Sequence, residues 1–468
     1  MSFLFGPCLI FIGRKVPLII ILICTNFYQV FAQQNVFIPA IEDEPELKMI
    51  SALLEKNYQW DNATLPSENK KELVKIYKQR RDNIQEKIDK KEIYTDSRAQ
   101  KYLDAIVAEI VKANPLLQHK EFKCYFSRSG IPNAAYLGEG FIIFNMGLFS
   151  RLDNESQAVF VLCHELAHFY LKHSENAIHN YVATFNSDEV QKQLRDIKKQ
   201  TYGKRAELEK LLKGLTFDTR RHGRDHESSA DSMGVEFMRN TRFDLSASLS
   251  TLALLDSIDT DTLNTEMVLQ NVFNAKDYPF KKRWINKEEG LLGGHARLKE
   301  DESFADSLKT HPDCKLRIKI LEPTILKYQS ASSLKNNIDK ATFDALKNIF
   351  RYEIIEYDFS SDNYTKSLQH AIELLQVNPS DPYLVAQIGK IFNEFYEAQK
   401  SHTLGKVTEL PAPYWESNYN LLLQFVQNLF LEDYAGIGYN FLKQYAPQME
   451  SYPAFKSVYN KSIQILKQ

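Results

Sequence analysis

Apolar residues recur at helical spacing in two segments near the start of the chain. Residues 68–94 carry them among dense mixed charge, at Leu73, Ile76, Ile84 and Ile88. Residues 97–117 carry them at Leu103, Ile106 and Ile110, and Asn114-Pro115 then stops the pattern. The spacing predicts two helices, the first of which is amphipathic, solvated, and suited to be an arm packed on the rest of the chain.

The pattern then changes to short β-rich runs, over residues 121–129 and 139–149. Between them, residues 130–140 contain Gly, Pro and Asn, so we expect a connector made of turns. Helical patterns resume over residues 155–173, 186–213, 226–240 and 246–258. Asp153 or Asn154 can cap the first of these helices. Residues 275–305 are rich in charge and glycine and are predicted to be an irregular loop.

From about residue 330 onward the pattern is helical throughout. Residues 363–400 resemble one tetratricopeptide-like hairpin, with Asn378-Pro379 at the turn. No clean repeat of about 34 residues recurs, so the pattern does not establish an array. The whole pattern predicts a mainly α protein with a small β-sheet, followed by an all-α domain of helical hairpins.

The first 32 residues have the layout of a secretory signal. Arg14 and Lys15 precede an apolar run from Val16 to Cys24, and Ala32 is a small residue at the expected cut. We expect cleavage after Ala32, with an uncleaved anchor as the alternative because apolar residues also precede Arg14. No segment after residue 35 approaches the ~18–20 apolar residues of a spanning helix, so we expect an exported, soluble protein.

Composition narrows the class of protein further. The chain has 468 residues, of which 44% are hydrophobic, so it has ample material for packed cores. Its net charge of -2 argues against nucleic acid as the main partner. Five cysteines are too few for a disulfide scaffold. After cleavage Cys124, Cys163 and Cys314 would remain, and Cys163 lies in an apolar helix where we expect it to be a buried core residue.

The segment His164-Glu165-Leu166-Ala167-His168 matches the pattern H-E-x-x-H. On a helix, positions four apart share a face, so both imidazoles can point at one metal ion. Glu165 is offset from that face and can reach a water on the ion. The competing interpretation is a pair of core histidines on an apolar helix, so a third ligand is needed to decide.

Glu227 and Asp231 favour the metal site, because they are also four residues apart in a helical segment. Glu227 can be the third zinc ligand, and Asp231 can accept a hydrogen bond from the second nitrogen of a ligand histidine. A solvated acidic face is the alternative, but the apolar neighbours of this pair predict a partly buried helix. We interpret His222 and His226 as surface residues, and His173 as a structural residue directed away from the ligand face.

Four segments in this order resemble the HtpX-like and CAAX-prenyl-protease-like zinc metallopeptidases, a gluzincin group. They are "PNAAYLGEGFIIFNMGLF", "SRLDNESQAVFVLCHELAHFYLKH", "HESSAD" and "THPDCKLRI". The resemblance covers roughly residues 95–325. Two features depart from the family pattern: Arg242 stands where relatives have glycine, and the 275–305 loop is long. The membrane spans of some relatives are absent.

The resemblance implies a zincin-type α+β domain and a role for each matched residue. His164, His168 and Glu227 would hold one Zn2+ per chain, Glu165 would be the general base, and Asp231 would orient a ligand. Asn133 and Ala134 would belong to a strand that pairs with an extended substrate. His311, in the His-Pro segment, would be a donor to the oxyanion, with a structural histidine as an equal alternative. Arg317 would form a buried salt bridge that fixes this segment.

We therefore expect a signal peptide over residues 1–32, an N-terminal helical arm over 33–95, a zinc metallopeptidase domain over 96–328, and an all-helical, tetratricopeptide-like domain over 329–468. The predicted function is that of an exported endopeptidase, periplasmic or secreted, which acts on polypeptides such as misfolded envelope proteins. Membrane association would arise only through an uncleaved N-terminal segment. The alternative is a non-catalytic chaperone or scaffold that binds clients through its helical tail.

Overall fold

The computed structural model describes residues 36–199, 204–258, 264–286, 314–329, 333–412, 415–449 and 451–468. Residues 39–468 form one unit by their internal contacts. The predicted signal peptide and His311 lie outside the described residues. Within the described ranges, no helix combines the length and the apolar character that crossing a membrane requires.

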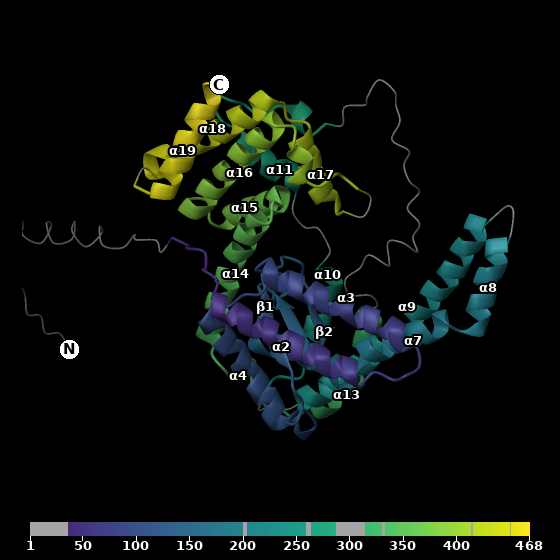
Figure 1. Ribbon diagram of the computed structural model, residues 1–468. Helices are drawn as coiled ribbons and strands as arrows, with labels where there is room; N and C mark the ends of the chain where they lie inside the picture. Colours follow the sequence, from purple (N-terminus) through teal and green to yellow (C-terminus); the bar gives the residue numbers. More distant parts are fainter. Residues whose placement is uncertain are drawn as a thin grey trace, which may run out of the picture. The chain divides into compact units, whose positions relative to one another are not determined.

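The predicted fold class is confirmed: the chain is mainly α, with one small sheet (Figure 1). The strands are β1 (Lys123–Ser127), β2 (Ala134–Gly138) and β3 (Phe141–Asn145). Strand β3 is central, parallel to β1 and antiparallel to β2, so β2 forms an edge of the sheet. The connector of turns predicted over residues 130–140 contains β2 between its turns, and the strand expected near Asn133 and Ala134 begins at Ala134.

Helices cover both faces of the sheet, which explains why β3 is buried along its whole length. Alternate residues of a strand point to opposite faces. Tyr125, Phe141 and Ile143 point to one face and pack with α2 (Glu44–Ala63) and α3 (Lys70–Asp89). These two helices lie within residues 33–95, which are referred to below as the N-terminal arm, and are drawn in purple and blue in Figure 1.

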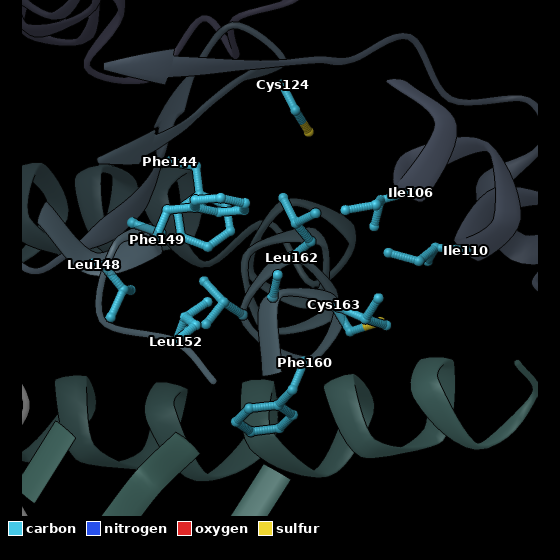
Figure 2. Close-up of a cluster of buried hydrophobic side chains, with 14 of the residues drawn as sticks. Ile106, Ile110, Cys124, Phe144, Leu148, Phe149, Leu152, Phe160, Leu162 and Cys163 are labelled. Carbon is cyan, nitrogen blue, oxygen red and sulfur yellow. The ribbon is translucent and has the colours of Figure 1, made fainter. Parts of the chain in front are cut away.

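The opposite face of the sheet belongs to the main core. Figure 2 shows its centre, where Cys124 and Phe144 of the strands face Leu162 and Cys163 of α6. The helices around this core are α4 (Ser97–Ala113), α5 (Met146–Phe149), α6 (Glu155–Tyr170), α9 (Lys204–Arg239), α10 (Ala247–Ser257) and α13 (Cys314–Tyr328). Cys163 is fully buried, as expected for a core residue, and no disulfide joins the three described cysteines.

The two predicted helical segments over 186–213 and 226–240 differ from the observed boundaries. The structure has α7 (His173–Phe185), α8 (Asp188–Lys199) and then the single 36-residue helix α9. Asn154, one of two predicted caps, accepts a hydrogen bond from the backbone N–H of Gln157 and begins α6.

Residues 333–468 are helical, as predicted. The helices are α14 (Lys340–Ser360), α15 (Tyr364–Val377), α16 (Pro382–Lys400), α17 (Ser417–Gln427), α18 (Leu431–Met449) and α19 (Pro453–Leu466). Neighbouring helices pack as α14 on α15, α15 on α16, and α18 on α19. The tetratricopeptide-like character of this region stays a prediction.

The described part of the predicted 275–305 loop packs against these helices. It follows α11 (Thr265–Phe273) and contains the 3-10 turn η2 (Lys282–Trp284). Trp284 is fully buried, and its ring meets Phe425 of α17 in a T-shaped contact. Lys281 and Arg283 form salt bridges with the buried carboxylate of Asp433 in α18. This segment is therefore fixed to the C-terminal helices by apolar and ionic contacts.

Helix α14 reaches into the main core and does not stop at its surface. Phe350 lies 4.8 Å from Phe126 of β1 and Phe343 lies 5.0 Å from Phe149 of α5, measured between ring centroids. Arg128, just after β1, forms a salt bridge of 3.2 Å with Glu353 of α14. Side chains from beyond residue 340 therefore pack directly on the sheet and its neighbouring helix α5.

Glu155 joins the start of α6 to the segment that leads into α14. Its fully buried carboxylate accepts hydrogen bonds from the backbone N–H groups of Asn337, Ile338 and Asp339, at 2.7–2.8 Å. The hydroxyl of Tyr102 donates a fourth, at 2.9 Å. One buried carboxylate thus accepts hydrogen bonds from three successive backbone N–H groups and fixes this segment to the start of α6.

We expect Glu155→Gln to lower the free energy of unfolding by roughly 2–5 kcal/mol, because an amide turns a donor toward N–H groups that need an acceptor. Denaturant unfolding followed by circular dichroism measures the change. Glu109→Gln, on the exposed face of α4, is the control and should unfold like the wild type. Equal unfolding midpoints for both variants would contradict this role of Glu155.

Candidate metal centre

Helices α6 and α9 pack closely and bring three predicted ligands together. The Nε2 atoms of His164 and His168 lie 3.0 Å apart. Oε2 of Glu227 lies 3.5 Å from Nε2 of His164, and Oε1 of Glu227 lies 3.3 Å from Nε2 of His168. Among the described residues, His164, His168 and Glu227 form a group of side chains that could hold one metal ion; this group is called the metal cluster below. Histidines four residues apart on α6 thus face a glutamate on α9.

Gly234 allows this close packing of the two helices. A Cβ atom at this position would lie 3.1–3.2 Å from the backbone N and Cα of His164. Such distances are tighter than ordinary side-chain contacts. A larger residue would therefore separate α9 from α6 and move Glu227 away from the histidines. Sequence analysis did not single out this glycine, although it follows Asp231 by only three residues.

The donor set fits a zinc ion. Tetrahedral zinc with nitrogen and oxygen ligands at about 2.0–2.2 Å places those ligands about 3.3–3.6 Å apart. The three observed separations, 3.0, 3.3 and 3.5 Å, lie close to that range. Two imidazole nitrogens and a carboxylate that converge on one point favour a cation there, which is a proton in the metal-free protein and can be a metal ion in its place. The three protein ligands leave one position of a tetrahedron for water.

Asp231 supports the first ligand from behind. It is 1% exposed, and one of its carboxylate oxygens lies 3.0 Å from Nδ1 of His164. Arg317 of α13 donates from Nε and Nη2 to the two oxygens of the same carboxylate, each at 2.7 Å. The prediction that Arg317 forms a buried salt bridge is confirmed. Its Nη1 also lies 3.2 Å from Glu227.

These charges act on the proton affinities of the site. Burial alone raises the pKa of Asp231, but Arg317 and His164 outweigh it and lower that pKa below its ordinary value. Burial likewise lowers the pKa of His164, but the carboxylates of Asp231 and Glu227 raise it above its ordinary value. The carboxylates therefore attract positive charge to the position between α6 and α9.

His173 supports the second ligand, a contact that sequence analysis missed. Its Nδ1 lies 3.0 Å from Nδ1 of His168, and its Nε2 lies 3.1 Å from the hydroxyl of Ser229. Since Nε2 of His168 faces the other ligands, its Nδ1 carries the proton and donates to His173. His173 then donates from Nε2 to Ser229, whose hydroxyl donates to a backbone carbonyl of α9.

Burial, together with the neighbouring His168 and His226, lowers the pKa of His173 to about 4. It is therefore neutral at neutral pH, as an acceptor at Nδ1 must be. His226 stacks on the His173 ring, with centroids 4.4 Å apart and planes at 7°. His226, interpreted from the sequence as a surface residue, is half-buried through this stacking. The side chain of His222 lies outside the described residues.

Glu165 lies beside the ligands and is held by the edge strand. Its Oε2 accepts a hydrogen bond of 2.7 Å from the backbone N–H of Tyr136 in β2. It is 8% exposed, and burial raises its pKa although His164 and His168 oppose the shift. A carboxylate with a raised pKa is a stronger base than an exposed one. The arrangement places a base, three metal ligands and a strand edge within one site.

Ala134 is the first residue of the same strand, and Asn133 directly precedes it. The carbonyl of Asn133 accepts a hydrogen bond from the N–H of Asn145, so the backbone of Asn133 faces β3. Because hydrogen-bonding direction alternates along a strand, the backbones of Ala134 and Tyr136 face away from β3. Of the predicted pair, Ala134 therefore presents its backbone groups to the open edge.

Comparison with known proteins agrees with this geometry. Residues 97–325 match Peptidase family M48, from the first turn of α4 into α13. No curated protein matches the chain. The matched residues include His164, His168 and Glu227, and the family's peptidases depend on zinc. The match supports metallopeptidase activity for this domain.

We expect His173→Phe to weaken zinc binding by about 10–100-fold, since residues that orient a ligand imidazole typically have effects of this size. Phenylalanine keeps the ring stacked on His226 but offers no acceptor to His168. Competition with a chelator of known affinity measures the change. His179→Phe, on the same helix α7, is the control and should bind zinc like the wild type. Equal affinities for both variants would show that His173 does not orient His168.

Zinc uptake at pH 7 should release a proton, because the raised pKa of His164 keeps that residue protonated in the metal-free protein. In the metal-free state this proton stabilises the fold fully below pH about 6.5, the unfolded value, and less as pH rises through the folded pKa. Calorimetric zinc titrations in two buffers of different protonation enthalpy count the protons. Affinity should rise between pH 6 and 8; a pH-independent affinity would contradict the expectation.

Proposed function

We propose that the chain is a zinc-dependent endopeptidase of the gluzincin type, with the motif H-E-x-x-H followed by E-x-x-x-D. One observation carries the proposal: the Glu165 carboxylate lies between a converging His164, His168 and Glu227 cluster and the backbone edge of β2. A scaffold needs the fold but has no use for a buried base beside a metal cluster. The geometry therefore favours catalysis over the chaperone alternative.

The substrate would bind as an added strand along β2. An edge strand offers main-chain groups to an extended peptide, which gives affinity with little dependence on side chains. Ala134 offers N–H and C=O, and Tyr136 offers C=O, because its N–H already bonds to Glu165. This places the peptide backbone beside the carboxylate that must act on the scissile bond.

Bound zinc would polarise the scissile carbonyl and lower the pKa of a coordinated water. Glu165, whose carboxylate lies beside the three candidate ligands, would hold a proton on that carboxylate and pass it to the leaving amine. The backbone N–H of Tyr136 holds Glu165 in place through Oε2. Asp231 and Arg317 keep His164 in the tautomer that binds through Nε2.

The biological setting is also part of the proposal. The signal-like pattern over residues 1–32 supports an exported, periplasmic or secreted enzyme, anchored to a membrane only if the segment is retained. Backbone-directed binding along β2 suits substrates that are locally unfolded, such as misfolded envelope proteins. The helices beyond α14 would recruit protein clients. His311, if it reaches the site, would donate to the oxyanion.

We expect Glu165→Gln to keep zinc but lower the rate of peptide cleavage by about 10²–10⁴-fold, because glutamine preserves volume and cannot accept the proton. Zinc content and cleavage of an unstructured peptide are measured on the same preparation. Glu236→Gln, on the outer side of α9, should retain wild-type activity. Full activity of a protease-free Glu165→Gln preparation would overturn the mechanism.

A further inference from the structure

Arg80 lies on α3, outside the matched residues 97–325, yet it reaches the turn that follows the edge strand. Its Nε and Nη2 donate to one oxygen of Glu139, at 2.9 and 2.8 Å. Its Nη1 donates to the hydroxyl of Ser174 in α7, at 3.2 Å. The guanidinium lies over the Tyr77 ring, 4.3 Å from its centroid, and the side chain is 11% exposed. Arg80 is therefore a buried link between the N-terminal arm and two elements beside the metal cluster.

The turn that Arg80 contacts has an unusual backbone. Gly138, Glu139 and Gly140 have φ angles of 102°, 49° and 74°, all in the region that favours glycine. Two contacts offset the conformational cost of the positive φ at Glu139: Arg80 donates to its carboxylate, and Asn57 of α2 donates to its carbonyl oxygen at 2.7 Å. A Cβ atom on Gly138 would lie 2.4 Å from the Arg80 guanidinium. The Arg80 side chain of the N-terminal arm therefore packs directly against the end of β2.

A second set of contacts leads from Arg80 to the catalytic carboxylate. Glu175 of α7 lies 3.7 Å from Nη1 of Arg80, and the hydroxyl of Tyr136 donates to the same Glu175 oxygen at 2.7 Å. The backbone N–H of Tyr136 donates to Glu165. Tyr136 is therefore fixed by its side chain to the neighbourhood of Arg80 and by its backbone to Glu165.

The charges around Arg80 make these contacts strongly dependent on it. Three carboxylates lie within 4 Å of its guanidinium nitrogens: Glu139, Glu175 and, at 3.8 Å, Asp61. The Glu139 side chain is fully buried. Without the guanidinium these buried and partly buried acids repel one another. Either the turn and α7 then move apart, or the acids take up protons. Separation of the turn from α7 displaces the end of β2, because Glu139 directly follows that strand.

We propose that Arg80 is a positioning residue for the active site: it holds the turn after β2 and the start of α7, and thereby sets the place of the substrate-binding edge relative to Glu165. The inference rests on the proposed function, because it assigns the substrate to β2. It also means that the N-terminal arm is part of the catalytic unit. Arg80 touches neither substrate nor metal ligands in this role.

The test compares Arg80→Gln and Arg80→Lys with Arg81→Gln, the neighbouring arginine on α3, whose partners are Glu55 and Asp82. All are studied as full-length, zinc-loaded protein, with an extended unstructured peptide as substrate. We expect Arg80→Gln to raise KM and lower kcat/KM by roughly 10–100-fold with zinc content unchanged, since misplacement by about 1 Å costs this much or more. Arg80→Lys should be intermediate because an ammonium cannot make both contacts to Glu139.

Hydrogen exchange of residues 134–140 gives a second readout that does not depend on activity. Exchange should be faster in Arg80→Gln and unchanged in Arg81→Gln. Wild-type KM together with wild-type exchange in Arg80→Gln would overturn the inference. So would a loss of kcat that matches a loss of folded, zinc-bound protein at constant KM. If zinc-loaded wild type and Arg81→Gln both fail to cleave, the proposed function fails, and the exchange rates alone decide whether Arg80 positions β2.

Discussion

A single buried carboxylate, Asp231, connects the two helices that carry the candidate metal ligands to a third helix, α13. It extends from α9, contacts His164 of α6, and receives two hydrogen bonds from Arg317 of α13. A carboxylate that is 1% exposed is stable only when other charges and donors replace the water it has lost. The fold must therefore bring α6 and α13 to α9, and the same approach places Glu227, one turn earlier, opposite the two histidines.

The two ligand histidines are supported in chemically different ways. His164 has an acid behind it, which increases the electron density of its imidazole as a ligand. His168 has the neutral His173 behind it, and a chain of hydrogen bonds continues to Ser229 and the backbone of α9. A second carboxylate there would add negative charge to a site that already has Glu227, Glu165 and Asp231. The neutral partner orients the ring without raising the cost of burying more charge.

Sequence patterns predicted the parts of the site that depend on helical periodicity, and missed the parts that depend on a change of chain direction. The spacing of His164 and His168, and of Glu227 and Asp231, follows directly from 3.6 residues per turn. His173 does not, because five positions along a continued helix point elsewhere. Helix α6 instead ends at Tyr170, Lys172 adopts a φ of 55°, and the chain turns back so that His173 faces His168.

The same distinction explains the edge strand. Gly, Pro and Asn over residues 130–140 indicate turns, and those turns do flank β2. The strand between them forms because Ala134, Ala135 and Tyr136 pair with Phe144, Ile143 and Ile142 of β3, a contact that local composition does not encode. The contacts of Arg80 are equally nonlocal, because Glu139 lies 59 positions further along the chain. No pattern within α3 distinguishes Arg80 from Arg81.

The boundaries of the matched domain are therefore not boundaries of the physical unit. Phe343 and Phe350 of α14 complete the aromatic core beneath the sheet, and Glu155 at the start of α6 is satisfied by backbone groups of residues 337–339. On the opposite face, α2 and α3 cover Phe141 and Ile143 of β3. A sheet of three short strands cannot bury both of its faces alone. The arm covers one face, and α14 adds to the cover that α4 and α6 give the other, so the position of β2 beside Glu165 depends on residues that precede and follow residues 97–325.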